Sequence, residues 1–230
     1  MERHNNETLS RILSVATELF SNQEYSGVSL RQLTKKAGVN LAAVNYYFGD
    51  KKSLYHAVVA RHIHPINQAR LNKLHEAEQV AGDKPVPLAV ILDILFRPFF
   101  ELNQDKINGG HHIGLIVGRS MVAPHIITNQ TLVRELQPIT PAFAHALRRQ
   151  VLNLPTDDFM WRLSFVVGAL HHTLATLHRM KELTQGICPD NDCEGALRRL
   201  IQFSTVTLTA PALNISDPQS PVPREFVDAD

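Results

Sequence analysis

The chain has 230 residues, with 23 lysines and arginines against 22 acidic residues and a formal charge of +1. This length suits one large or two small domains, and an apolar content of 44% excludes wholesale disorder. The sequence has no apolar run long enough to span a bilayer, a polar start without a secretion signal, and only two cysteines. We therefore expect a cytoplasmic protein with no membrane partner.

Charge is unevenly distributed along the chain. Residues 1–75 hold ten basic and five acidic side chains, a net charge of +5, whereas residues 76–230 hold 13 basic and 17 acidic ones, a net charge of −4. A basic N-terminal part is typical of proteins that meet a polyanion such as DNA. A chance fluctuation in surface charge gives the same imbalance, so the motifs must decide between the two interpretations.

Two short helices are predicted after the polar start. Apolar residues at helical spacing predict a first helix over about 8–22. Ser29 with Gln32 three positions later forms a capping-box pattern that predicts a second helix over 30–37. Gly38 then ends this helix as a C-cap.

A third helix follows the glycine turn. Asn40 is a suitable N-cap for a helix over 41–48, and Asp50 can cap a fourth helix that begins at Lys51. A helix, a tight glycine turn and a second helix form the helix-turn-helix pattern. In this motif the helix after the turn lies in the major groove of DNA, with its N-terminal residues nearest the base edges.

The third predicted helix carries residue types that suit DNA. Small alanines permit close approach and can contact a thymine methyl group, while asparagines can bond adenine or phosphate. Tyrosine hydroxyls and a lysine suit phosphate oxygens, although a hydrophobic core cluster is an alternative for the aromatic residues. The residues assigned from this region are Asn40, Leu41, Ala42, Ala43, Asn45, Tyr46, Tyr47 and Lys51.

The segment SLRQLTKKAGVNLAAVNYYFGDKKSL, residues 29–54, resembles the DNA-binding domain of TetR-family transcriptional regulators, and the resemblance extends over about residues 8–60. It implies an all-α homodimer with an N-terminal three-helix helix-turn-helix DNA-binding domain and a C-terminal helical ligand-binding and dimerisation domain. It also implies a palindromic operator that is released when a small molecule binds. We assign residues 1–52 to the DNA-binding domain, 53–210 to the ligand and dimerisation domain, and 211–230 to a flexible tail.

By position, the resemblance places the phosphate-contacting lysine at Lys51 and further phosphate contacts near Ser29 and Arg31. Asn45 stands where the family commonly has tyrosine, and Tyr47 where it commonly has histidine. The shorter Asn45 side chain reaches less far than the tyrosine that it replaces.

The C-terminal part is rich in apolar residues that predict helices over 88–102, from Ile113 to about 124, and over 128–153 with breaks at two prolines. Pro65 is expected to bend or end the fourth helix. The excess of apolar residues predicts an elongated ligand cavity. An arginine in this cavity can bind a carboxylate through its guanidinium. The alternative is that each arginine is a surface ion-pair partner, which is the more common role of an isolated arginine. The predicted ligand residues are Phe96, Arg97, Phe99, Phe100, Ile116, Arg119 and Met121.

The motif at residues 38–48 and, more weakly, the run from Gly118 to Met121 are similar to the fatty-acid-responsive regulators of lipid metabolism within the same family. The resemblance therefore implies a fatty acid or acyl thioester as effector. A drug-like or other hydrophobic compound is the alternative.

The family resemblance implies that two helices near the C-terminus, over about 156–183 and 192–209, pack against their symmetry mates as a four-helix bundle. A self-complementary two-fold interface is also the commonest oligomeric arrangement. A purely monomeric core is the rival interpretation. The predicted interface residues are Phe159, Leu163, Val167, Leu170, Leu174, Leu197 and Ile201.

The chain contains 12 histidines, which raise the alternative of a metal-dependent enzyme. His111, His112 and His125 form one group in the sequence, and His171, His172 and His178 form another. The sequence has no HExxH motif, no carboxylate-spaced triad and no nucleophile elbow. We expect no catalytic residue, no metal and no cofactor.

Overall fold

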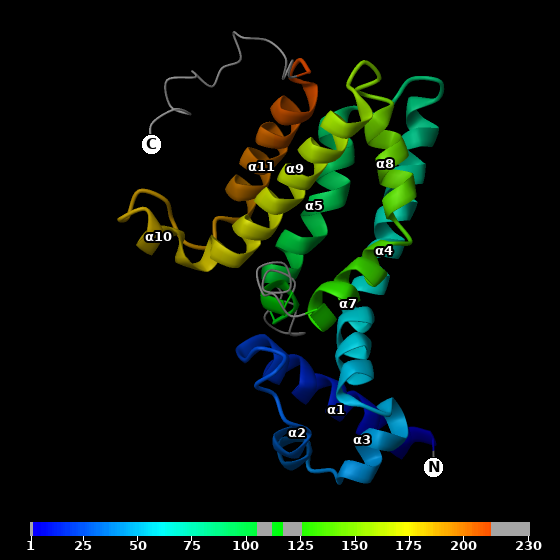
Figure 1. The fold of residues 1–230 in the computed structure, drawn as a ribbon, viewed down its shortest axis with the longest axis vertical. Helices are drawn as coiled ribbons and strands as arrows, with labels where there is room; N and C mark the ends of the chain where they lie inside the picture. The colour runs from blue at the N-terminus through cyan, green and yellow to red at the C-terminus, as the bar shows by residue number, and fades with distance from the viewer. Residues whose placement is uncertain (1, 105–111, 117–125, 213–230) are drawn as a thin grey trace, which may run out of the picture.

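The computed structural model describes residues 2–104, 112–116 and 126–212, and these residues form helices and turns without any strand (Figure 1). The all-α prediction is confirmed. The helices follow one another as α1 (Glu2–Asn22), α2 (Leu30–Ala37), α3 (Leu41–Phe48), α4 (Lys51–Ala81), α5 (Leu88–Gln104), α7 (Ile126–Leu136), α8 (Thr140–Arg148), α9 (Thr156–Thr176), η1 (Leu177–Arg179), α10 (Met180–Leu183) and α11 (Cys193–Thr209). Residues 112–116 are also helical.

The first three helices form a small unit at one end of the molecule (Figure 1). Ile12, Leu33 and Val44, one from each helix, are fully buried, and Leu54 of α4 completes the same core. Burial of each such side chain contributes about 1.5–3 kcal/mol relative to its exposure to water. The α1 helix begins at Glu2, well before the predicted start at residue 8, and its early turns contact α3 through Asn5.

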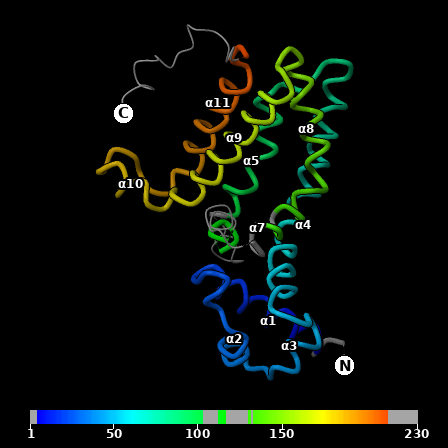
Figure 2. Tube along the Cα trace, in the orientation of Figure 1, coloured from blue at the N-terminus to red at the C-terminus, as the bar shows by residue number. Residues whose placement is uncertain are grey.

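The long helix α4 connects this unit to the rest of the molecule, as the tube in Figure 2 shows. It continues through Pro65, so the predicted bend or interruption does not end it there. Pro65 has no amide, so the carbonyl of Arg61, four residues earlier, loses its helical donor. Both residues are exposed, so water can donate to this carbonyl instead. The predicted domain boundary at residue 52 falls in the first turn of this helix, which is therefore shared by both parts.

The C-terminal helices surround α5, which packs against α4, α8, α9 and α11. Two prolines explain one departure from the prediction. The predicted helix over 128–153 is two helices, with Pro138 in the turn between them and Pro141 in the first turn of α8, where its missing amide costs nothing. The predicted helix over 156–183 ends at Thr176 and continues as the short turns η1 and α10.

Arg162 connects α9 to the end of α11 and is only 7% exposed. Its guanidinium binds both carboxylate oxygens of Asp158, at 3.1 and 2.8 Å. It also donates to the carbonyls of Thr207, Ala210 and Pro211 at 2.9, 2.6 and 2.7 Å. These carbonyls lie at the end of α11, where the last carbonyls of a helix have no amide donor within the helix. Arg162 therefore caps the C-terminus of α11 from a neighbouring helix.

None of the helices in the described ranges has the length and hydropathy that a membrane crossing requires.

Candidate functional site

Three local devices fix the two ends of α2 and the start of α3. The Ser29 hydroxyl accepts the Gln32 amide at 3.1 Å, and the Asn40 side chain accepts the Ala43 amide at 2.8 Å. Gly38 ends α2 at φ 63°, a left-handed conformation that glycine adopts without a Cβ clash. These predicted caps are confirmed, and they hold α3 at a set angle against α2.

The α3 helix presents one face to solvent and one to the core. Leu41 and Tyr46 are 50% and 78% exposed, and Ala42 and Asn45 are exposed with them. Positions three to five residues apart lie on the same side of a helix, so these four side chains form one strip, which we call the α3 strip. Val44 is fully buried on the opposite side, and Ala43 is half-buried between the two.

The two tyrosines of α3 differ in their surroundings. The Tyr47 hydroxyl donates to the Asn5 carbonyl at 3.3 Å and also bonds the Asn5 side chain, and the residue is half-buried. Asn5 therefore occupies the hydroxyl that the sequence assigns to a phosphate, whereas the Tyr46 ring packs edge-on against Tyr47 and stays exposed. The contact with Asn5 ties α3 to the start of α1.

Lys51 begins α4 beside this strip. Its ammonium lies 4.4 Å from the centre of the Tyr25 ring and 3.4 Å from the Ser26 carbonyl, and partial burial lowers the pKa of Lys51. Asp50 caps the same helix by accepting the Ser53 amide at 2.7 Å, and this backbone hydrogen bond lowers the pKa of the Asp50 carboxyl. The stem of Lys51 is thus ordered near a helix N-terminus, which favours a phosphate.

Arg31 and Ser29, at the start of α2, are both exposed. Further basic side chains are exposed on the same unit, at Lys35, Lys36 and Lys52. Lys36 is paired with Glu18 at 2.5 Å, so part of this charge is neutralised within the protein.

We expect Lys51→Ala to weaken binding to every operator by a similar factor and to lower the slope of log affinity against log salt by about one unit, because one phosphate contact is lost. Fluorescence anisotropy over a range of salt concentrations measures this slope. Lys73→Ala is the matched control, since Lys73 is an exposed lysine farther along α4. An unchanged slope for Lys51→Ala would show that Lys51 does not contact phosphate.

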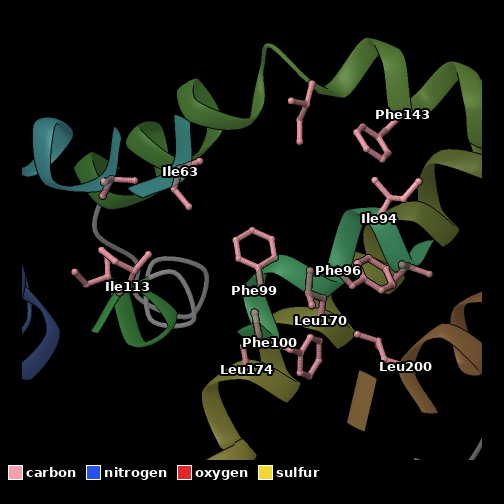
Figure 3. Packing of buried hydrophobic residues seen from close by; sticks show 14 of the residues in the cluster. Ile63, Ile94, Phe96, Phe99, Phe100, Ile113, Phe143, Leu170, Leu174 and Leu200 are labelled. Carbon is pink, nitrogen blue, oxygen red and sulfur yellow. The ribbon is translucent and has the colours of Figure 1, made fainter. Parts of the chain in front are cut away.

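The predicted ligand residues fall into three groups. Phe96, Phe99, Phe100 and Ile116 are buried in the C-terminal core, and Figure 3 shows Phe99 of α5 pointing towards the region between Ile63 of α4 and Phe143 of α8. Arg97 is engaged on the surface, where Asp93 holds it at 2.7 Å and Glu194 at 3.0 Å. Two carboxylates of the protein itself thus occupy its guanidinium. Arg119 and Met121 lie outside the described residues.

Sequence reasoning overlooked Arg70, which is fully buried on α4. The position had no distinguishing pattern, because a single arginine in a long helix with mixed polar and apolar residues is ordinarily exposed.

The predicted dimer residues lie mostly inside the protomer. Phe159, Leu170, Leu174 and Leu197 are 4% exposed or less, so these four side chains belong to the core of the protomer. Leu163, Val167 and Ile201 are half-buried. The same two helices carry large exposed apolar side chains on another side, which we call the α9/α11 apolar face: Met160, Trp161, Phe165, Phe203 and Val206.

Among the described residues, no group of three or more histidine, cysteine, aspartate or glutamate side chains is placed to hold a metal ion. His111 and His125 lie outside these residues.

Comparison with known proteins agrees with this arrangement. Residues 12–58 match the family described as bacterial regulatory proteins, tetR family, and residues 93–205 match the tetracyclin repressor-like C-terminal domain. The chain belongs to the TetR family. The match of both regions, in order, fits the helix-turn-helix unit and the α5-centred helical part of this TetR-family protein.

Individual relatives resemble mainly the N-terminal part. The HTH-type transcriptional regulator AcrR of Shigella flexneri is 36% identical over 91 residues, 40% of each chain. The HTH-type transcriptional regulator SrpR of Pseudomonas putida is 40% identical over 60 residues, 26% of this chain and 28% of SrpR. The probable HTH-type transcriptional regulator YttP of Bacillus subtilis is 38% identical over 53 residues, 23% of this chain and 26% of YttP. In each case the match spans less than half of the relative's length.

Proposed function

We propose that this TetR-family protein is a ligand-controlled transcriptional repressor that binds a palindromic operator as a homodimer and is released by a small apolar effector. The α3 strip is the observation that carries the proposal. It is exposed, it follows a glycine turn, and its helix is held by the cap at Asn40 and by the contact between Tyr47 and Asn5. A rigid, exposed helix of small and polar residues suits the major groove.

The roles divide between base and phosphate contacts. Ala42, Ala43 and Asn45 are assigned to base edges, since the alanines permit close approach and the amide can pair with adenine. Lys51, Arg31, Ser29 and the Tyr46 hydroxyl are assigned to phosphates. In a dimer, the two copies of α3 must lie about 34–36 Å apart to enter successive major grooves on one side of the duplex.

We propose a fatty acid or acyl thioester as the effector, in preference to a drug-like compound. The aromatic side chains of α5 and Ile116 are buried in the C-terminal core, and ligand sites are predominantly apolar with a few polar groups. The similarity of residues 38–48 to fatty-acid-responsive members of the family points the same way. Because α4 runs without interruption from Lys51 into the C-terminal part, a shift of this helix alters the position of α3.

Selection of bound sequences from random duplex DNA tests the DNA-binding part of the proposal. We expect enrichment of a palindrome whose half-sites are centred about one helical turn apart. Mass spectrometry of ligands retained by the purified protein tests the effector, and we expect acyl species. Absence of any enriched palindrome contradicts the operator proposal, and operator binding that no acyl species displaces contradicts the effector proposal.

We expect Asn45→Ala, and separately Ala43→Ser, to change the preferred base pair at one position of each half-site, with a loss of discrimination of about 1–3 kcal/mol for the amide contact. The measurement is the relative affinity for single-base variants of the selected operator. Lys52→Ala is the control, because loss of an exposed charge weakens all sequences alike. If Asn45→Ala weakens every variant equally, Asn45 does not read a base.

A further inference from the structure

Arg70 of α4 is enclosed at the packing interface between α4 and α5. Its side chain is 0% exposed. One terminal nitrogen, Nη1, donates to the Asn67 side chain at 3.1 Å, and the other, Nη2, donates to the Leu95 carbonyl. The guanidinium carbon lies 4.2 Å from the centre of the Phe99 ring. Among the described residues, the remaining nitrogen, Nε, has no hydrogen-bond partner.

These contacts orient the guanidinium but do not neutralise it. An amide, a carbonyl and an aromatic ring are uncharged, and within the described residues no carboxylate pairs with Arg70. Arg97 and Arg162 differ, since Arg97 is held by Asp93 and Glu194, and Arg162 by Asp158. Arg148 also contacts only carbonyls and an aromatic ring, but it is half-buried rather than fully buried. Burial lowers the pKa of Arg70 to about 9, which still leaves the group charged at neutral pH.

A structural role for Arg70 accounts for part of this arrangement. Pro98 has no amide, so the Ile94 carbonyl lacks its helical donor, and the guanidinium donates to the carbonyl of the next residue, Leu95. A neutral donor would satisfy the same carbonyl. The buried positive charge and the unpartnered Nε are not explained by this role, because an unpaired charge in an apolar interior is strongly unfavourable.

We propose that Arg70 binds the carboxylate of the effector through the edge that contains Nε, so that the effector is a free long-chain fatty acid. This inference rests on the proposed function and selects between its two acyl classes. Guanidinium and carboxylate groups form paired, charge-assisted hydrogen bonds with matching geometry. A thioester carbonyl carries no negative charge for this site, whereas a carboxylate pairs with the buried guanidinium.

The same position explains how binding reaches the DNA-contacting end. Asn67, which orients Arg70, also donates to the Glu135 carbonyl of α7 at 2.6 Å. A carboxylate that draws Arg70 away from Asn67 or Leu95 alters the contacts of α4 with both α7 and α5. Arg70 lies 19 residues beyond Lys51 on this one helix, about 28 Å along its axis.

The decisive experiment compares oleate with oleyl alcohol, which has the same chain but no charge, by isothermal titration calorimetry. We expect the unmodified protein to bind oleate about ten- to a hundred-fold more tightly than the alcohol. Arg70→Met is expected to reduce this ratio to within about threefold, through a loss of oleate affinity. Arg97→Met is the matched control and is expected to keep the ratio, because Arg97 already has two carboxylate partners.

A second measurement does not depend on whether Arg70→Met folds. In the unmodified protein, the carbon-13 resonance of carboxyl-labelled oleate is expected to stay at its ionised position well below the pH at which a free fatty acid is protonated. If the bound carboxyl group becomes protonated at or above the pH at which a free fatty acid does, Arg70 does not bind it. If the unmodified protein binds oleate and oleyl alcohol equally, or if Arg70→Met keeps the same ratio of the two affinities, Arg70 does not bind the carboxylate. Either result is still compatible with an apolar effector. Binding of neither compound overturns both this inference and the acyl effector.

Discussion

Phe165→Glu is expected to separate the dimer into monomers and to lower operator affinity by at least about a hundred-fold, because a monomer keeps only one half-site. Phe165 is 57% exposed on the α9/α11 apolar face, next to Trp161, whose ring centre lies 5.9 Å away. Exposed aromatic side chains in a contiguous group are typical of protein–protein interfaces. A buried, unpaired carboxylate at their centre opposes association of two copies.

Light scattering measures the oligomeric state, and anisotropy measures operator affinity on the same samples. Val80→Glu is the control, since Val80 is 91% exposed on α4, and Figure 1 places the end of α4 away from α9 and α11. We expect this control to remain dimeric. If Phe165→Glu also remains a dimer with unchanged affinity, the interface lies elsewhere.

Arg162→Met is expected to lower the free energy of unfolding by about 3–5 kcal/mol, because it leaves the partly buried Asp158 without its cation and removes the cap of α11. The three carbonyls that Arg162 binds lose their donor at the same time. Denaturant unfolding followed by circular dichroism measures this change.

The matched control for Arg162 is Arg179→Met, which breaks a pair with Glu182 in which both side chains are more than half exposed. Solvent screening makes such a pair weak, so we expect little or no change. Similar losses of stability for the two variants would contradict the structural role assigned to Arg162.

Local capping chemistry made the N-terminal unit predictable. Ser29, Asn40 and Asp50 each accept a backbone amide three residues ahead, a pattern that is visible in the sequence without any tertiary information. Gly38 marks a left-handed residue for the same local reason. The sequence therefore predicted the bounds of α2 and α3 and the exposed position of the α3 strip.

The sequence did not show which side of a helix faces which partner. The α9 helix has large apolar residues on both sides, with Phe159 and Leu174 buried and Trp161 and Phe165 exposed. Apolar periodicity alone cannot separate a protomer core from an interface in such a helix.

Contacts between distant residues were also hidden. The pairing of Tyr47 with Asn5 extends α1 and occupies a hydroxyl that the local motif assigned to DNA. Arg70 was overlooked because its burial depends on α5 and Phe99, which the sequence of α4 does not contain. Tertiary packing decided these positions, and local patterns do not encode it.

The central claim is that effector binding controls operator binding by a dimer. The most direct test is anisotropy of a fluorescent duplex that carries the selected palindrome, titrated with protein in the presence and absence of saturating oleate. We expect two protomers to bind each duplex without oleate, and we expect oleate, but not oleyl alcohol at the same concentration, to release the DNA. Operator binding by single protomers, or occupancy that oleate leaves unchanged, would contradict it.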